Sequence, residues 1–461
     1  MKRREVAVIN GFAVMIKSGG TTVLSLLVLS LTVLSFSSYA RFPKSDASQL
    51  GKTLTPLGAE RAGSQTGIPS WSDTPPSSDE LAEIYQQSPL FVIRHDNYEA
   101  HKSLLSEGQI ALLEAYPETF FMPVFQSHRT HHVPDYIYEA TRKNASEAQL
   151  IDDGHGISNV WQGTPFPMPT SAKEVLWNHL VSWRGLLLEL RFTEALVYAN
   201  KTATLIHSVA DISMPYYDPS RDVYQGNHVK TYYLTRTVFP PQLAGGALLV
   251  HDTLNLRSDP RRAWAYMAQQ RRVRRMPSLE HDTPNPNSGH VRVVDEVDIF
   301  NGTPERYEWT LLGKQEMLIP YNNEHLSKIE NSSLTQLHHI KMDQTRFERH
   351  RVWVIEGNLK ISENHLYKRR RLYIDEDSWL AVMAEQFDHN NTLWRASLSF
   401  TKYYPDMPGV LKVVDAYHDL KTGDHFAQAI IDSEKSAVIF HDGLPKKSDF
   451  MPSRLRQIGT R

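Results

Sequence analysis

The fold is decided by three neighbouring stretches: VDEVDIFNGTPERYEWTLLGKQEMLIPYNN (Val294–Asn323), RFERHRVWVIEGNLK (Arg346–Lys360) and HLYKRRRLYIDEDSWL (His365–Leu380). Each is rich in β-branched and aromatic residues and is bounded by Gly, Pro, Asn or Asp. This pattern is typical of consecutive antiparallel strands joined by turns. A similar stretch, AWAYMAQQRRVRRMP (Ala263–Pro277), precedes them. The centre of the chain is therefore predicted to form a large sheet.

Strand-like segments continue on both sides of this centre. They are Arg191–Asn200, Lys201–Val209, His228–Val238 and Gly246–Asn255 upstream, and Ala381–Phe387, Asn391–Thr401, Lys412–Asp419 and Phe426–Asp432 downstream. Most of them are separated by short polar turns such as KTGD (Lys421–Asp424). About a dozen strands are expected in total.

Helical patterns lie mainly in the first half of the chain. They are predicted at Gly58–Ala62, Leu81–Tyr85, Ser106–Tyr116, Pro134–Ala145 and Ala172–Trp183, and somewhere within Glu324–Leu337. Glu174 follows Ser171 at the third position, which completes a capping box at a helix start. Because helices precede strands rather than alternate with them, the predicted fold class is α+β, mostly β.

The N-terminus has the pattern of a secretory signal. Lys17 precedes the apolar run Val23–Phe36, and Ser38 and Ala40 fit a cleavage site. We expect a signal peptide over residues 1–40, a mixed helical and loop region over 41–160, a β domain over 161–442 and a polar tail over 443–461. The predicted location is the periplasm, with or without a peripheral contact to the outer membrane. An uncleaved anchor and a start at Met15 remain alternatives.

Composition excludes several classes of function. A formal net charge of -2 and a pI near 6.9 argue against nucleic acid as the main partner. The absence of cysteine excludes thiolate zinc sites and cysteine nucleophiles. No GxSxG, HExxH, Walker or GxGxxG motif is present, so no enzyme activity, catalytic residue or cofactor is predicted. A dispersed triad keeps a hydrolase as a weak alternative.

Two clusters of polar side chains have both a functional and a structural interpretation. His128, His131 and His132, with His155, suit a metal site or a polar loop, and we predict no metal. The arginines Arg271, Arg272, Arg274 and Arg275, and the run Lys368–Arg371, are candidates for contact with lipid headgroups or a partner protein. Pairing with nearby carboxylates such as Asp295 or Asp375 is the favoured alternative.

Apolar and aromatic side chains alternate along several of the predicted strands. A curved sheet can present such residues as an apolar groove, or they can be ordinary sheet core. The candidate residues for hydrophobic ligand binding are Trp309, Leu311, Trp353, Ile355, Leu359, Tyr373 and Trp394.

A family resemblance covers nearly the whole chain after residue 40. The chain resembles the Gram-negative exported proteins grouped as domain of unknown function 1329, often labelled outer-membrane lipoprotein-sorting proteins. The residues that carry the resemblance are TPLGAERAG (Thr55–Gly63), GTPFPMP (Gly163–Pro169), VLWNHL with WRG (Val175–Gly185), DTLN (Asp252–Asn255), the stretches quoted above and LWR (Leu393–Arg395). One departure is MAQQ (Met267–Gln270), where the family has a Pro-Gly turn.

The resemblance implies a fold similar to the LolA/LolB lipoprotein carriers. Such a fold is a strongly curved, incomplete antiparallel barrel whose open side is covered by helices, and it holds acyl chains in its concavity. The family's genes accompany RND-type inner-membrane transporters and an outer-membrane protein. The lack of a lipid-anchor cysteine favours a LolA-like shuttle over a LolB-like membrane-anchored receiver.

The expected function is therefore that of a periplasmic, non-catalytic carrier of a lipid, lipoprotein or other hydrophobic molecule. Its expected partners are a lipid or acyl chain and, transiently, a membrane. The alternative is an adaptor that bridges an RND-type transporter to an outer-membrane protein.

Overall fold

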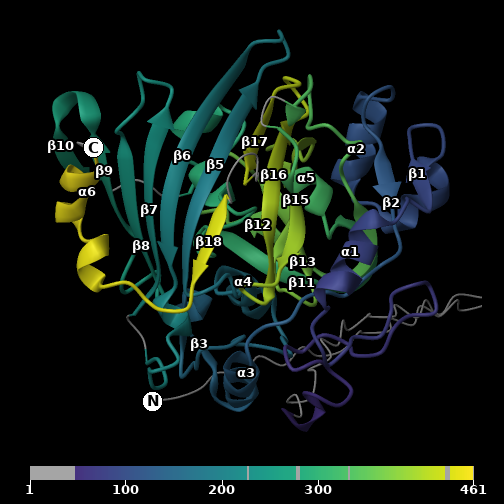
Figure 1. The fold of residues 1–461 in the computed structure, drawn as a ribbon, viewed down its shortest axis with the longest axis horizontal. Helices are drawn as coiled ribbons and strands as arrows, with labels where there is room; N and C mark the ends of the chain where they lie inside the picture. Colours follow the sequence, from purple (N-terminus) through teal and green to yellow (C-terminus); the bar gives the residue numbers. More distant parts are fainter. Residues whose placement is uncertain (1–46, 226–227, 277–280, 331–332, 431–436, 460–461) are drawn as a thin grey trace, which may run out of the picture. The chain divides into compact units, whose positions relative to one another are not determined.

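The three stretches that decide the fold form β11 (Tyr307–Pro320), β12 (Phe347–Leu359) and β13 (Arg369–Asp375), paired antiparallel in that order (Figure 1). The computed structural model describes residues 47–225, 228–276, 281–330, 333–430 and 437–459, which belong to one unit spanning Lys44–Arg461. The expected signal peptide and its cleavage site near Ala40 lie outside the described residues.

One sheet of sixteen strands dominates the described part of the chain. Its strand order is β1-β2-β12-β13-β14-β15-β16-β17-β5-β6-β7-β8-β9-β10, with β11 also beside β12 and β18 also beside β5. All pairings are antiparallel except one bridge between Phe347 and Val124. The path starts at β1 and ends at β10 without closing. The predicted mostly β, α+β class with an open antiparallel sheet is confirmed.

The remaining elements have the following bounds. The other strands are β1 (Phe91–Ile93), β2 (Met122–Val124), β3 (Gln149–Ile151), β4 (Gly156–Ser158), β5 (Leu187–Val197), β6 (Ala203–Ser213), β7 (Val229–Phe239), β8 (Ala247–Thr253), β9 (Arg262–Met267), β10 (Arg272–Arg275), β14 (Ala381–Phe387), β15 (Leu393–Tyr404), β16 (Gly409–Asp419), β17 (His425–Ala429) and β18 (Val438–His441). The α-helices are α1 (Ser78–Gln86), α2 (Glu107–Ala115), α3 (Asp135–Glu147), α4 (Ala172–Leu180), α5 (Glu324–Ser327) and α6 (Pro452–Gly459).

Helix α4 lies at the centre of the largest hydrophobic cluster. Ser171 and Glu174 form the predicted capping box at its start. Its apolar side chains belong to one cluster with residues of β5, β12, β13 and β16, so strands from both halves of the sheet share this core. Trp177 is completely buried, and its indole N–H donates to the carbonyl of Gly154 at 3.0 Å. The sheet therefore curves around α4.

The opposite face of β12–β16 is covered by the N-terminal elements. Leu112 and Leu113 of α2 are fully buried in a second cluster with Val354, Tyr373 and Met383. Helix α2 begins with a capping box between Ser106 and Gln109, at the predicted start. The central strands are therefore covered on both faces.

The C-terminal residues form a third, smaller cluster on the sheet. The segment predicted as a polar tail contains α6, and Phe450 and Leu455 are buried against Leu234, Leu249 and Tyr266. Among the described residues, no helix is long and apolar enough to cross a membrane.

Two further helix predictions need correction. The helix predicted at Gly58–Ala62 is wrong, because Gly58 has a φ of +99° and lies against the backbone of Pro167. A side chain at Gly58 would overlap the Pro167 carbonyl, so this segment is a turn fitted to the Gly163–Pro169 loop. The helix predicted within Glu324–Leu337 is limited to α5.

Burial of a neutral histidine on α4 makes folding depend on pH. Ala381 N–H donates to His179 Nδ1 at 3.0 Å, and His179 Nε2–H donates to the Phe300 carbonyl at 2.8 Å. Burial lowers the pKa of His179 from 6.5 to about 4. The folded protein thus binds fewer protons than the unfolded chain between these values. Stability from His179 is present above pH 6.5 and is lost as pH falls toward 4.

We expect His179→Asn, which keeps the acceptor for Ala381, to reduce the loss of unfolding free energy between pH 6.5 and 4. The reduction should be on the order of 3 kcal/mol, measured by urea unfolding at several pH values. The exposed His95 gives the matched control, since His95→Asn should keep the wild-type pH dependence. Equal pH dependence in all three proteins would contradict the assignment.

Candidate functional site

The predicted ligand residues of β11 and β12 lie in the interior of the protein. Ile355 is fully buried in the cluster around α4, and Trp309, Leu311 and Trp353 are half-buried and pack against the same cluster. Leu359 is half-buried near the end of β12, opposite Tyr307. The structure brings Trp309, Leu311, Trp353 and Ile355 together against the cluster around α4.

Tyr373 and Trp394 lie apart from that group. Tyr373 is paired with Val354, on the other face of the sheet from Ile355, and its hydroxyl donates to Glu385. Trp394 is half-buried near the start of β15, where its indole N–H donates to Asp419 at 2.9 Å. The seven predicted residues therefore do not line one cavity.

The histidines of the loop before α3 are held by protein groups. His131 is buried and accepts from Val410 N–H at 3.1 Å, while His132 stacks on Trp71 with ring centroids 5.0 Å apart. The side chains of His128 and Gln87 hydrogen-bond to each other. Across the described residues, no group of three metal-ligating side chains includes a histidine of this loop.

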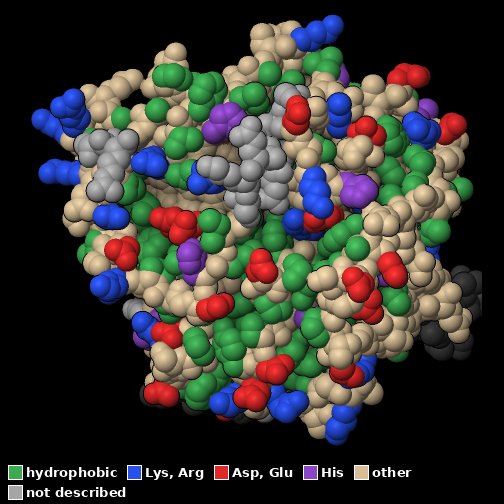
Figure 2. All heavy atoms as spheres, in the orientation of Figure 1, with side chains coloured by type: hydrophobic (Ala, Val, Ile, Leu, Met, Phe, Trp, Pro, Cys, Tyr) green, Lys and Arg blue, Asp and Glu red, His purple; other side chains and the backbone are tan. Residues whose placement is uncertain are grey.

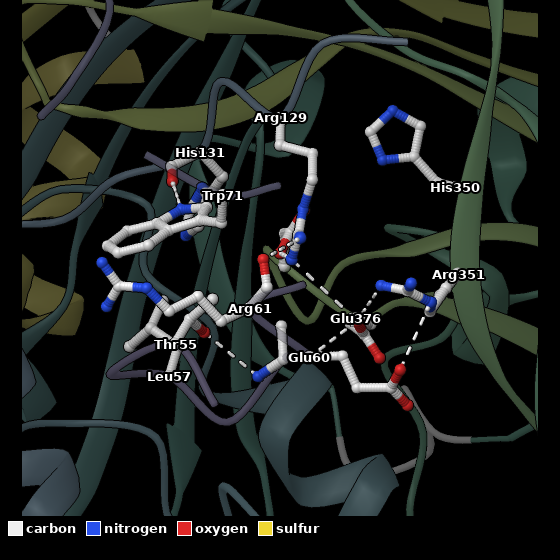
Figure 3. A network of polar contacts seen from close by, with 12 residues as sticks. Thr55, Leu57, Glu60, Arg61, Trp71, Arg129, His131, His350, Arg351 and Glu376 are labelled. Carbon is white, nitrogen blue, oxygen red and sulfur yellow. Dashed lines mark hydrogen bonds and ion pairs between the residues drawn. The ribbon is translucent and has the colours of Figure 1, made fainter. Parts of the chain in front are cut away.

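The turn Ile374–Trp379 (IDEDSW), between β13 and β14, is the centre of a buried ionic network (Figure 3). Arg129 donates to both carboxylate oxygens of Asp377, at 2.8 and 2.6 Å. Glu376 forms ion pairs with Lys314 at 3.0 Å and Arg351 at 3.6 Å, and accepts from Glu60 N–H at 2.9 Å. The network ties the N-terminal TPLGAERAG segment and the histidine loop to the sheet.

Three buried ligand-type side chains in this network are His350, Asp375 and Asp377, whose donor atoms lie within 4.8 Å of one another. Burial and the neighbouring Asp377 raise the pKa of Asp375. Burial would lower the pKa of His350, but its hydrogen bond to Glu348 and the nearby carboxylates raise it. Both oxygens of Asp377 already bind Arg129. We interpret the group as a charge-balanced ionic network and assign no metal to it.

A groove of about 730 Å³ lies on the face of β5, β6 and β7 that points away from α4. Strand β18 and helix α6 flank it, and in Figure 1 β18 lies beside β5 whereas α6 lies to the left of β7 and β8. It is lined by Glu189, Leu190, Arg191, Val209, Ala210, Asp211, Leu234, Thr235, Arg236, Val238, Ala437, Ile439 and Ile458. This groove is the candidate site.

Four of the groove residues, Glu189, Leu190, Ala210 and Asp211, fell outside the predicted strands, because the predicted bounds were too short there. The predicted strands began at Arg191 and ended at Val209, whereas β5 begins at Leu187 and β6 ends at Ser213. The useful signal is the alternation LLELRF (Leu187–Phe192), which places Glu189 and Arg191 on the face opposite Leu188 and Leu190.

The two predicted basic clusters have different surroundings. Arg370 is buried and binds Asp295 at 2.7 Å, as predicted. The β9–β10 hairpin carries the run Arg271, Arg272, Arg274 and Arg275. Its turn is formed by MAQQ (Met267–Gln270) and by Arg271, whose backbone is in the left-handed conformation. None of these four side chains forms an ion pair with a described residue. Blue side chains protrude at the left edge of Figure 2, where Figure 1 places this hairpin.

Comparisons by sequence match this chain to a known family. Residues 92–456 match the model described as protein of unknown function (DUF1329). Uncharacterized protein PA3922 of Pseudomonas aeruginosa is 37% identical over 449 residues, which cover 94% of this chain and 98% of that protein.

Comparisons by structure find more distant similarity. A putative outer membrane lipoprotein-sorting protein domain from Vibrio parahaemolyticus is 16% identical, with a TM-score of 0.42 over 61% of this chain and 97% of the other. The LolA superfamily protein NE2245 from Nitrosomonas europaea is 12% identical, with a TM-score of 0.35 over 61% of this chain and 98% of the other.

Removal of one charge of the buried Arg129–Asp377 pair should destabilise the protein more than removal of both charges. Arg129→Met leaves the buried Asp377 without its partner, so we expect it to lower the free energy of unfolding by about 3–5 kcal/mol. Arg129→Met combined with Asp377→Leu removes both charges and should restore most of that loss. Urea unfolding measures both variants.

The matched control is the exposed pair of Lys102 and Glu99. Lys102→Met should leave the unfolding midpoint unchanged, because solvent screens that pair. If the double variant were less stable than Arg129→Met alone, the buried charge of Asp377 would not be the source of the cost.

Proposed function

We infer that this chain, which belongs to the DUF1329 protein family, is a non-catalytic carrier of a lipid or other hydrophobic molecule. The observation that supports this proposal is the groove on β5–β7. Its volume of about 730 Å³ falls within the usual range for small-ligand sites, roughly 300–1,000 Å³. The binding site is thus proposed on the outward face of these strands rather than at Trp309, Trp353 and their neighbours.

The groove combines apolar walls with charged groups. Val209, Leu234, Val238, Ile439 and Ile458 provide the apolar surface, and both Val238 and Ile439 are 44% exposed. An acyl chain that covered them would gain about 0.8 kcal/mol for each buried methylene. Association costs offset much of that gain. The result is reversible binding, which suits a molecule that must be released again.

The proposed setting is the periplasm, between the inner and outer membranes. This part rests on the N-terminal signal pattern of residues 1–40. The carrier would receive its cargo from, or deliver it to, a membrane or an RND-type transporter. The described groove lining contains no histidine, and Thr235, its one hydroxyl side chain, donates to the Val209 carbonyl. A binding role therefore fits the groove better than hydrolysis.

Filling the groove should abolish ligand binding. We expect Val209→Trp to remove co-purified lipid and to lower the affinity for a fluorescent fatty acid at least about tenfold. Native mass spectrometry of protein purified from the periplasm without detergent measures the first effect, and fluorescence titration measures the second.

Thr310→Trp is the matched control for that variant, because it adds the same side chain at an exposed position of β11 outside the groove. It should bind like wild type. Loss of binding in Thr310→Trp but not in Val209→Trp would place the ligand elsewhere. A wild-type protein that carries no lipid and takes up no apolar probe would refute the carrier.

The β9–β10 hairpin favours a second candidate function, an adaptor between envelope proteins. β10 is an edge strand that pairs only with β9 among the described residues, and its unpaired arginines lie beside the exposed Met267 and Met276. Edge strands and exposed arginines are common contact elements. An acidic partner protein or an anionic membrane surface would complement this hairpin.

Charge reversal tests the adaptor. Arg272→Glu with Arg274→Glu should abolish crosslinking in intact cells to an inner-membrane transporter or outer-membrane protein, while lipid binding in the groove stays unchanged. Lys52→Glu with Lys446→Glu reverses two exposed charges elsewhere and should have no effect. Equal crosslinking in both double variants would exclude the hairpin as the contact.

A further inference from the structure

The charged residues of the groove are arranged in two rows that cross the strands. Strand pairing aligns Ile439, Glu189, Asp211 and Leu234 in one row. It aligns Arg191, Val209 and Arg236 in the next row on the same face. Two residues along a strand separate the rows by about 6.8 Å. One row is therefore acidic and the adjacent row is basic.

The protein itself neutralises these charges only in part. Glu189 binds His441 at 2.9 Å, and one Arg236 N–H donates to the Ile458 carbonyl at 3.3 Å. No described residue forms an ion pair with Arg191, Asp211 or Arg236. Asp211 is an exposed residue, and partial burial together with the neighbouring Glu189 raises its pKa. The charges of Arg236, Arg454 and His441 oppose this shift without cancelling it, so the counter-charge of Asp211 is incomplete.

Each row offers the type of group that one half of a zwitterion requires. Two guanidinium groups bind a phosphate through charge-assisted hydrogen bonds, and Arg is suited to this because of its planar fork of donors. Two carboxylates accept hydrogen bonds from a primary ammonium group. The short spacing between the rows is comparable with the length of a phosphoethanolamine group.

Apolar residues continue from both rows. Ile439 and Leu234 flank the acidic carboxylates, Val209 separates the two arginines, and Val238 extends the lining further along β7. A headgroup over the two rows would therefore place its acyl chain on apolar surface. Neither a purely anionic nor a purely cationic head would satisfy both rows.

We propose that the groove binds a zwitterionic amphiphile, an acyl chain whose headgroup carries a phosphate next to a primary ammonium. Arg191 and Arg236 bind the phosphate, and Glu189 and Asp211 bind the ammonium. This inference rests on the proposed carrier function and specifies the class of its cargo.

Titration of the full-length exported protein with three lysophospholipids of the same acyl chain tests the inference. The three headgroups are phosphoethanolamine, phosphocholine and phosphoglycerol. Wild type should bind lysophosphatidylethanolamine about tenfold more tightly than the other two, because only its head donates hydrogen bonds from an ammonium. Calorimetry below the critical micelle concentration provides the affinities.

Two double variants separate the rows. Glu189→Gln with Asp211→Asn should weaken only lysophosphatidylethanolamine and remove the preference. Arg191→Gln with Arg236→Gln should weaken all three ligands, since each carries a phosphate. Glu308→Gln, an exposed carboxylate on β11, should leave all affinities unchanged. Thermal unfolding confirms that each variant is folded.

Equal affinities for the three headgroups, with no effect of either double variant, would overturn the headgroup inference while the carrier function stood. Absence of binding to all three, together with a wild type that carries no co-purified lipid and takes up no fluorescent fatty acid, would overturn the carrier function itself. A preference for lysophosphatidylglycerol that the Arg191 and Arg236 variant abolished would show an anion site and would also overturn the zwitterion assignment.

Discussion

The structure depends on how helix α4 meets the polar ends of the segments around it. A helix buried inside a curved sheet must satisfy its own terminal groups and those of the loops that reach it. His179 bridges the Phe300 carbonyl and the Ala381 amide, Lys230 donates to the Leu180 carbonyl, and Trp177 donates to Gly154. One nine-residue helix thereby fixes β7, β14 and two loops relative to one another.

This packing also decides where a ligand can bind. The large apolar side chains of β11 and β12 on the face toward α4 pack in or against the hydrophobic cluster around that helix, so they stabilise the fold. On β5–β7 the opposite face lacks such a helix over part of its width, and there charged and aliphatic side chains alternate at the surface. The same strands are therefore structural on one face and available for binding on the other.

Much of the fold was predictable, because local patterns and long-range pairing agree in it. The capping boxes at Ser106 and Ser171 and the strand Ala381–Phe387 are encoded in neighbouring residues. The candidate site was not predictable in the same way. Alternation in β12 shows which side chains share a face, but nothing local shows that α4 covers that face. Gly58 illustrates the same limit, because its positive φ follows from contact with Pro167, more than a hundred residues away.

Helix α6 forms a wall of the groove that is less stable than the strands beneath it. It supplies one wall through Ile458, yet it is the last described element, and Leu455 and the preceding Phe450 are its buried anchors. A short helix packed at the edge of a sheet opens locally at a lower free energy than the sheet beneath it. The width of the groove is thus governed by a local equilibrium that can shift without unfolding the core. Ligand that bridges the strands and Ile458 would protect the amides of α6 from hydrogen exchange.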